Sequence, residues 1–227
     1  REHKLFTNYR LIGPAPGGGL LAYKTGLADI PEVVMLHSDG EESLLLKTGF
    51  VFEDAFSSNG KSLVWSEYRR SARWEHLSWS EIHHLDMLSG EVQKLTNRTR
   101  YFSPAISPDG RLIAVRETDL QDNHFLVLLD ALSGEVIDKF SAENNALIMS
   151  PAWHTDGNTI ALIAQDQEGK RIDLFDIQSG VFQTLLNSGQ TEIARPGFAT
   201  DRQLLFEASY AGKNDIWAID LDSGEIT

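Results

Sequence analysis

The side chains that could perform catalysis follow no known enzyme pattern in this sequence of 227 residues. It contains no Gly-x-Ser-x-Gly nucleophile motif, no His-Glu-x-x-His zinc pair and no phosphate-binding Gly-x-x-x-x-Gly-Lys loop. Cysteine is absent, which excludes disulfides, thiolate metal sites and a cysteine nucleophile. Asp109 and Asp156 precede turn glycines, where an aspartate usually accepts hydrogen bonds from its own turn. We therefore predict no catalytic residue and expect a protein that is not an enzyme.

The seven histidines are candidate metal ligands. His83 and His84 are adjacent in a predicted strand, so their side chains point to opposite faces and cannot share one ion. We therefore expect no metal site and no other cofactor.

A cluster of arginine and aromatic residues between 66 and 86 is the best candidate for recognition. Three arginines fall within five residues, in a chain whose formal net charge is −13. Arginine and tryptophan are enriched at the energetic centres of protein interfaces, and loops on a rigid scaffold commonly carry recognition. The alternative is that the tryptophans fold back onto the domain and the arginines form ordinary ion pairs. The predicted partner-binding residues are Arg69, Arg70, Arg73, Trp74, His76, Trp79 and Tyr101.

The overall charge narrows the classes of partner. The chain has 20 basic and 33 acidic residues and a pI of about 4.9. Nucleic-acid binders and polybasic membrane-surface proteins depend on clustered basic residues over a broad face, so we expect no nucleic-acid partner. The apolar runs are only a few residues long, whereas a membrane-spanning helix needs about 20, so no transmembrane segment is predicted.

Two kinds of turn recur along the chain with one period. Glycines at 18, 60, 110 and 157 open a short apolar run, and Arg202 takes the same place in a fifth copy. Glycines at 40, 90, 134, 180 and 224 each directly follow an Asp or Ser residue, and an apolar run precedes that pair. Both series repeat at about 46 residues, and each repeat reads as four short strands without a helix, which is typical of a β-propeller blade. A sandwich is the alternative, but it would not require a fixed period.

We therefore predict an all-β protein, a β-propeller of four-stranded antiparallel blades, as one domain over residues 1–227. The predicted blades are 9–48, 49–97, 98–141, 142–190 and 191–227. Residues 3–8 resemble a fourth strand and could complete the last blade, which would close a five-bladed ring. The other interpretation is that these are five blades of a larger ring of six to eight, within the usual size range.

The segments SPAISPDGRLIAV at 103–115, LLDALSGEV at 128–136 and MSPAWHTDGNTIALIA at 149–164 resemble the TolB-type, WD-like repeat of bacterial propellers. The resemblance covers nearly the whole chain, although the first repeat has PGGG in place of SPDG and the fifth has Arg202 in place of glycine. It implies a propeller fold. Proteins with this repeat include periplasmic TolB, propeller domains of peptidases, and envelope proteins that join it to a peptidase-like domain and an outer-membrane barrel. The pattern Arg73-Trp74 followed by Ser78-Trp79-Ser80 is similar to the third group, which implies a periplasmic or envelope location and fusion to such domains.

The sequence supports three functional hypotheses. We favour a non-catalytic propeller that binds a protein or peptide through loops at one face, as an accessory domain of a larger bacterial envelope protein. The second is a propeller enzyme, a lyase or hydrolase that could depend on a metal, with its site in the central channel. The third is a structural gate or spacer for a peptidase domain.

Overall fold

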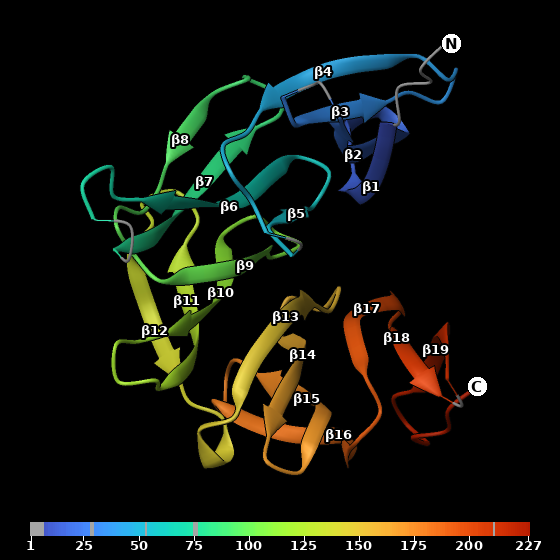
Figure 1. The fold of residues 1–227 in the computed structure, drawn as a ribbon. Coiled ribbons are helices and arrows are strands. Elements are labelled where there is room, and N and C mark those ends of the chain that lie inside the picture. Colours follow the sequence, from blue (N-terminus) through green and yellow to red (C-terminus); the bar gives the residue numbers. More distant parts are fainter. Residues whose placement is uncertain (1–6, 28–29, 53, 75–76, 211) are drawn as a thin grey trace.

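The computed structural model describes residues 7–27, 30–52, 54–74, 77–210 and 212–227. These residues form five antiparallel sheets, and together they confirm the predicted all-β propeller (Figure 1). Blade one contains β1 (Thr7–Pro14), β2 (Leu20–Gly26), β3 (Glu32–Leu36) and β4 (Glu42–Lys47), and blade two contains β5 (Phe56–Ser58), β6 (Ser62–Arg70), β7 (Ser78–Asp86) and β8 (Val92–Lys94). Blade three contains β9 (Tyr101–Ile106), β10 (Leu112–Thr118), β11 (His124–Asp130) and β12 (Val136–Phe140). Blade four contains β13 (Leu147–Trp153), β14 (Thr159–Asp166), β15 (Gly169–Asp176) and β16 (Val181–Gly189), and blade five contains β17 (Ile193–Thr200), β18 (Gln203–Tyr210) and β19 (Lys213–Asp220). Two short 3₁₀ turns, η1 (Pro16–Gly18) and η2 (Glu143–Asn145), lie between strands.

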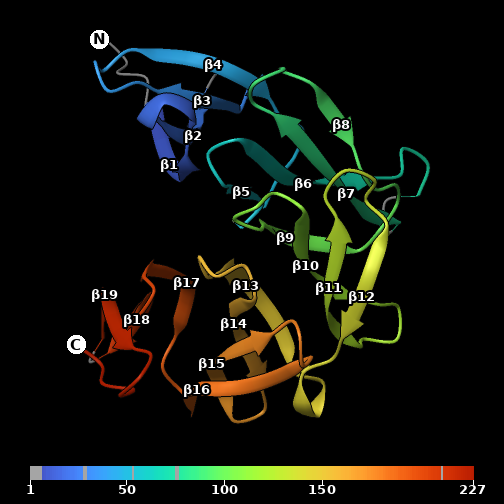
Figure 2. The same ribbon diagram turned by 180° about the vertical axis from the view of Figure 1, so that it is seen from behind.

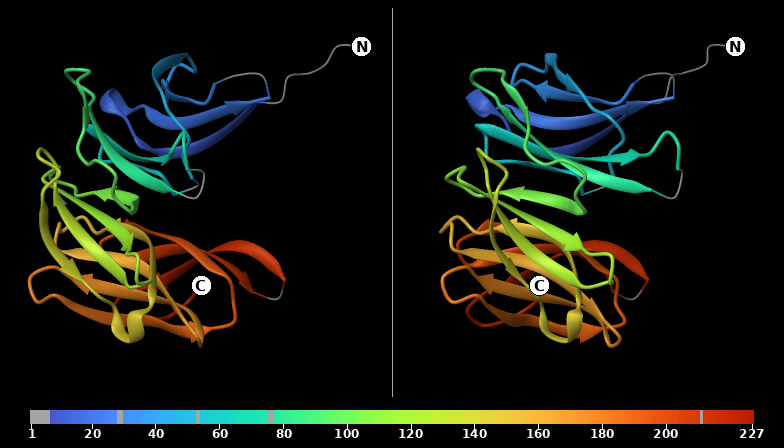
Figure 3. Two further views of the ribbon diagram at one scale, coloured as in Figure 1. Left: turned by 60° about the vertical axis from the view of Figure 1, so that its left-hand side comes forward. Right: turned by 90° about the vertical axis from the view of Figure 1, so that its left-hand side faces the viewer.

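The blades are arranged as an arc (Figures 1 and 2), and their inner strands line one central channel. The first strand of each blade faces the channel, and β1, β5, β9, β13 and β17 follow one another around it. Neighbouring blades pack against each other, but among the described residues no comparable contact joins β1 to β17. The arc is therefore open between blades one and five. The turned views in Figure 3 show blades one to four one below another, with blade five beside blade four.

Apolar side chains on both faces of the middle strands hold the blades together. In β10, Ile113, Ala114 and Val115 are all fully buried. Ala114 faces the core shared with blade four, whereas Ile113 and Val115 face the core shared with blade two. This two-sided burial explains why the sequence of such a strand is continuously apolar rather than alternating.

The recurrent aspartates have the structural role expected from their turns. Asp130 accepts hydrogen bonds from the backbone N–H groups of Leu132 and Ser133, at 3.0 and 2.7 Å. These bonds hold the pKa of the Asp130 carboxyl below its usual value. The same arrangement recurs at Asp86, Asp176 and Asp220. The two candidate acids behave similarly, since Asp109 accepts from the Arg111 N–H and Asp156 from that of Asn158.

The ends of the chain differ from the predicted closing strand. Residues 3–6 lie outside the described residues, but Thr7 and Asn8 pair with Gly26 and Thr25 as the start of β1. The assignment of Thr7 and Asn8 to the last blade is therefore wrong, because they continue the first strand of blade one. Blade five instead begins its own fourth strand, with Thr227 and Ala218 exchanging two backbone hydrogen bonds of 2.9 Å.

Candidate partner-binding face

The hairpin between β6 and β7 projects from the end of the blade where second strands turn into third strands. The Ser71 hydroxyl accepts hydrogen bonds from the N–H groups of Arg73 and Trp74, each at 3.2 Å, and the Leu77 N–H donates to the Trp74 carbonyl at 2.9 Å. The turn presents a Trp74 side chain that is 51% exposed, with the Arg73 guanidinium 5.5 Å from its ring centroid. Arg73 and Trp74 thus lie in the exposed loop that the sequence indicated, whereas His76 lies outside the described residues.

Arg69 is paired with carboxylates of its own blade. Its guanidinium pairs with Glu67 at 2.6 Å and with Glu81 at 3.3 Å, and Lys94 also pairs with Glu81 at 3.4 Å. Glu67 is buried and accepts further hydrogen bonds from the Trp65 indole and the Gly49 N–H. Arg69 therefore compensates buried carboxylates on the side of blade two that faces blade one.

Trp79 and Tyr101 are both partly buried. The Arg98 guanidinium lies 5.0 Å from the Trp79 ring centroid, while the Trp79 Nε1 is buried without a hydrogen-bond partner among the described residues. Tyr101 packs against the core between blades two and three, and burial raises the pKa of its hydroxyl. The structure therefore gives Tyr101 a packing role and separates Trp79 from the tip of the hairpin.

A group of aromatic residues that are not among the predicted partner-binding residues lies beside this hairpin. Phe50 and Phe52 are 62% and 47% exposed, and their rings lie 5.9 and 5.1 Å from the ring of Tyr68. Phe102 lies 6.1 Å from Phe52. The sequence contains one sign of this group: Phe50 and Phe52 lie two residues apart in the connection between blades one and two, where polar residues are usual.

Arginine side chains surround these rings. The Arg70 guanidinium lies 5.4 Å from the Tyr68 ring centroid, and Arg116 lies 5.1 Å from that of Phe102. We call the surface formed by these residues and the hairpin tip the arginine–aromatic patch; its members are Phe50, Phe52, Tyr68, Arg70, Arg73, Trp74, Arg100, Phe102 and Arg116. Stacking of arginine on aromatic rings keeps both groups ordered while leaving guanidinium N–H groups available to a ligand.

The tyrosine in this patch provides a direct test of its electrostatics. Hydrogen bonding with Ser78 and Arg70, together with the charge of Arg100, lowers the pKa of Tyr68, whereas burial raises the pKa of Tyr23. In an alkaline absorbance titration, we expect the phenol step at lowest pH to disappear in Tyr68→Phe and to remain in Tyr23→Phe. A lowest-pH step that is unchanged in Tyr68→Phe would contradict the described arrangement.

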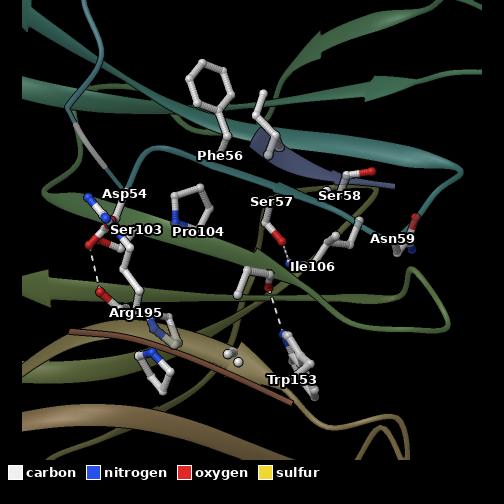
Figure 4. A pocket seen from close by; sticks show the side chains of 18 of the residues that line it. Asp54, Phe56, Ser57, Ser58, Asn59, Ser103, Pro104, Ile106, Trp153 and Arg195 are labelled. Carbon is white, nitrogen blue, oxygen red and sulfur yellow. Dashed lines mark hydrogen bonds and ion pairs between the residues drawn. The ribbon is translucent and has the colours of Figure 1, made fainter. Parts of the chain in front are cut away.

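The central channel reaches the same face of the molecule. It encloses about 790 Å³ and is lined by the inner strands of all five blades. At one end Asp54 accepts a hydrogen bond from the Ser150 hydroxyl at 2.7 Å, and Arg195 lies 3.8 Å from Asp54 and 2.8 Å from Glu207. Figure 4 shows Asp54, Ser103 and Arg195 gathered at this end, away from Asn59 and Trp153.

A repeated distortion of the inner strands places these side chains. Ser103, Ser150 and Arg195 have φ angles of 50°, 47° and 49°, and a register shift occurs at each of the three positions. Each residue precedes a proline. A β-bulge of this kind redirects a side chain, so three blades direct different groups toward one end of the channel.

The channel and the patch are continuous. A smaller cavity of about 280 Å³ is lined by Phe52 and Phe102 from the patch and by Asp54 and Ser103 from the channel. The candidate site is therefore one face of the propeller, which combines an exposed arginine–aromatic surface with a polar channel mouth.

The described residues contain no group of three or more His, Asp or Glu side chains placed to hold a metal ion. They also contain no helix with the length and apolar character needed to cross a membrane.

These features define a β-propeller with a candidate binding surface at its loop face. The fold is similar to that of TolB from Acinetobacter baumannii, with a TM-score of 0.75 and 16% sequence identity over 96% of this chain and 53% of that protein. It is also similar to a putative TolB from Agrobacterium tumefaciens, with a TM-score of 0.61 and 21% identity over 82% of this chain and 64% of that one.

Peptidases share the same architecture. A puromycin-hydrolyzing peptidase from Mycobacterium tuberculosis matches with a TM-score of 0.61 and 17% identity, over 97% of this chain and 37% of that protein. The chain thus spans less than two thirds of the length of each of these proteins. No protein-family model and no curated protein sequence matches it. The TolB-like propeller fold indicated by the repeats is confirmed.

Proposed function

We propose that this chain is a non-catalytic propeller that binds a protein or peptide partner through its loop face. The observation that carries the proposal is the arginine–aromatic patch, in which Phe50, Phe52 and Trp74 are about half exposed or more on a rigid scaffold. Interface centres are enriched in aromatic residues and arginine, and exposed apolar groups gathered in one place on a soluble surface commonly mark such sites.

We further propose that the chain acts as an accessory domain of a larger bacterial envelope protein. The fold shared with TolB and with peptidases, and the partial coverage of both, support this proposal. A periplasmic or envelope location belongs to the same proposal, as does fusion to a peptidase-like or outer-membrane barrel domain.

The proposal is tested by selecting binders from a random peptide library displayed on phage. Peptides selected on the wild-type chain should lose affinity by about 30-fold on Arg73→Ala/Trp74→Ala, the loss expected of an interface hot spot. The matched control is Arg111→Ala/Leu132→Ala, which removes an exposed arginine and an exposed apolar residue from turns at the opposite face. If no peptide is enriched, or if both double variants bind equally, the loop face is not the binding surface and a gate or spacer role is favoured.

One observation favours the catalytic alternative. Asp54, Ser150, Arg195 and Glu207 come from three blades and converge at the channel mouth, where Ser150 and Arg195 are different side chains at the same position of the repeat. However, no histidine lines the described part of the channel, and Asp54 and Glu207 are both paired with Arg195. Hydrolysis of a fluorogenic peptide that is lost in Asp54→Asn would support an enzyme, and no difference between the two proteins would count against it.

A further inference from the structure

The arginines of the arginine–aromatic patch form no ion pair within the part of the chain that the structure describes. Seven of the twelve arginines lie between residues 69 and 116. Six of these seven lie outside the turn that contains Arg111. Arg69 pairs with Glu67 and Glu81. In contrast, no carboxylate of a described residue lies within ion-pair distance of Arg70, Arg73, Arg98 or Arg100.

Three described carboxylates near this surface are already engaged. Glu81 pairs with Arg69 and Lys94, Glu117 pairs with Lys139 at 2.9 Å, and Asp54 lies against Arg195. A protein with 33 acidic residues therefore leaves several arginines without a described carboxylate on one face. Hydrogen bonding with Ser78 and Arg70 lowers the pKa of Tyr68, and the charges of Arg70 and Arg100 lower it further.

We propose that the partner segment bound at this patch is acidic, with aspartate or glutamate side chains flanking an aromatic or large aliphatic anchor. This inference rests on the proposed function and specifies the chemistry of the partner. The exposed rings of Phe50 and Phe52 supply the contact for the anchor. Arg70 and Arg73 supply the contacts for the carboxylates, because a planar guanidinium matches a carboxylate with two parallel hydrogen bonds.

The geometry favours one side of the patch for the carboxylates. Arg70 is the last residue of β6, and Arg73 lies in the hairpin that follows it, so the two arginines are only three positions apart in the chain. The net charge of −13 disfavours binding of an acidic ligand elsewhere on the surface. At 0.1 M salt, charges more than about 10 Å apart are largely screened, so only the carboxylates close to the patch affect binding there. Recognition would therefore be local, and it would orient the segment with its anchor toward Phe50 and Phe52.

Three synthetic peptide series test this inference, each with a central Trp or Leu flanked by Asp and Glu, by Asn and Gln, or by Lys and Arg. Fluorescence anisotropy should show the acidic series binding about ten-fold more tightly than the neutral series, in keeping with several charge-assisted hydrogen bonds. Arg70→Gln/Arg73→Gln should reduce the acidic series to the affinity of the neutral series while leaving the neutral series unchanged. Neither arginine side chain makes an ion pair with a described residue, so thermal unfolding should stay close to wild type.

The matched control is Arg111→Gln/Arg202→Gln, which removes two exposed arginines from the opposite face and should change neither affinity. Equal binding of the acidic and neutral series, or an acidic preference that survives in Arg70→Gln/Arg73→Gln, would overturn the inference and leave the proposed function standing. If no series binds and the library selection also fails, the proposed function itself is overturned.

Discussion

Replacing Arg171 with leucine is expected to destabilise the propeller by about 3–5 kcal/mol, the usual cost of leaving a buried charge without its partner. The Arg171 Nε donates to Asp173 at 2.9 Å, and another guanidinium nitrogen contacts Asp166 at 2.5 Å. The Arg171 and Asp173 side chains are only 9% and 2% exposed. Once Arg171 is removed, Asp173 keeps the Thr184 hydroxyl as a donor but no compensating charge.

The double variant Arg171→Leu/Asp173→Leu separates the unpaired charge from the loss of packing. It should recover most of the lost stability, because a buried ion pair replaced by apolar residues of similar volume is often neutral. Urea unfolding followed by tryptophan fluorescence measures both effects. Equal destabilisation by the single and double variants would show that the unpaired charge of Asp173 is not the cause of the lost stability.

Gly169→Ala is expected to disrupt blade four. Gly169 has a φ of +125°, and a Cβ atom there would lie 2.0 Å from the carbonyl oxygen of Gly189. The backbone conformation alone costs an L-residue about 1–3 kcal/mol. The overlap is with backbone rather than a movable side chain, so β15 and β16 would have to separate at this edge. We expect little folded protein at 37 °C.

Gly157→Ala is the matched control. It lies in the turn that precedes β14, at a φ of +69°, and a Cβ atom there would meet nothing within 4 Å. Its cost should be limited to the left-handed conformation, about 1–2 kcal/mol. Circular dichroism melting compares the two variants. A Gly169→Ala protein that melts at or above the temperature of Gly157→Ala would contradict the described packing of β16.

The repeat made the fold predictable. Turn glycines such as Gly110 and Gly134 adopt positive φ angles of 77° and 74°, so the sequence marks where each hairpin turns. The role of Asp130 and its equivalents was predictable because an aspartate before such a turn satisfies local N–H groups. The path of residues 7–8 was not, because a short strand with a common sequence pattern could join either of two blade edges.

The site was only partly predictable, because the register of the strand decides which arginine pairs with a carboxylate of the protein and which can contact a partner. Arg69 and Arg70 are neighbours in β6 and point to opposite faces. Arg69 thereby shares a face with Glu67, while Arg70 shares one with Tyr68. The contact between Asp54 and Ser150 joins residues 96 positions apart, and no local pattern indicates such a pair.

Hydrogen–deuterium exchange of the chain with and without a bound acidic peptide tests whether the partner binds at the loop face. We expect slower exchange in 50–52, 68–74 and 99–102, which contain Phe50, Tyr68 and Phe102, and no change in the turns at 107–111 and 131–135. Protection confined to those opposite turns, or to the inner strands of the channel alone, would contradict the assignment of the loop face as the binding surface.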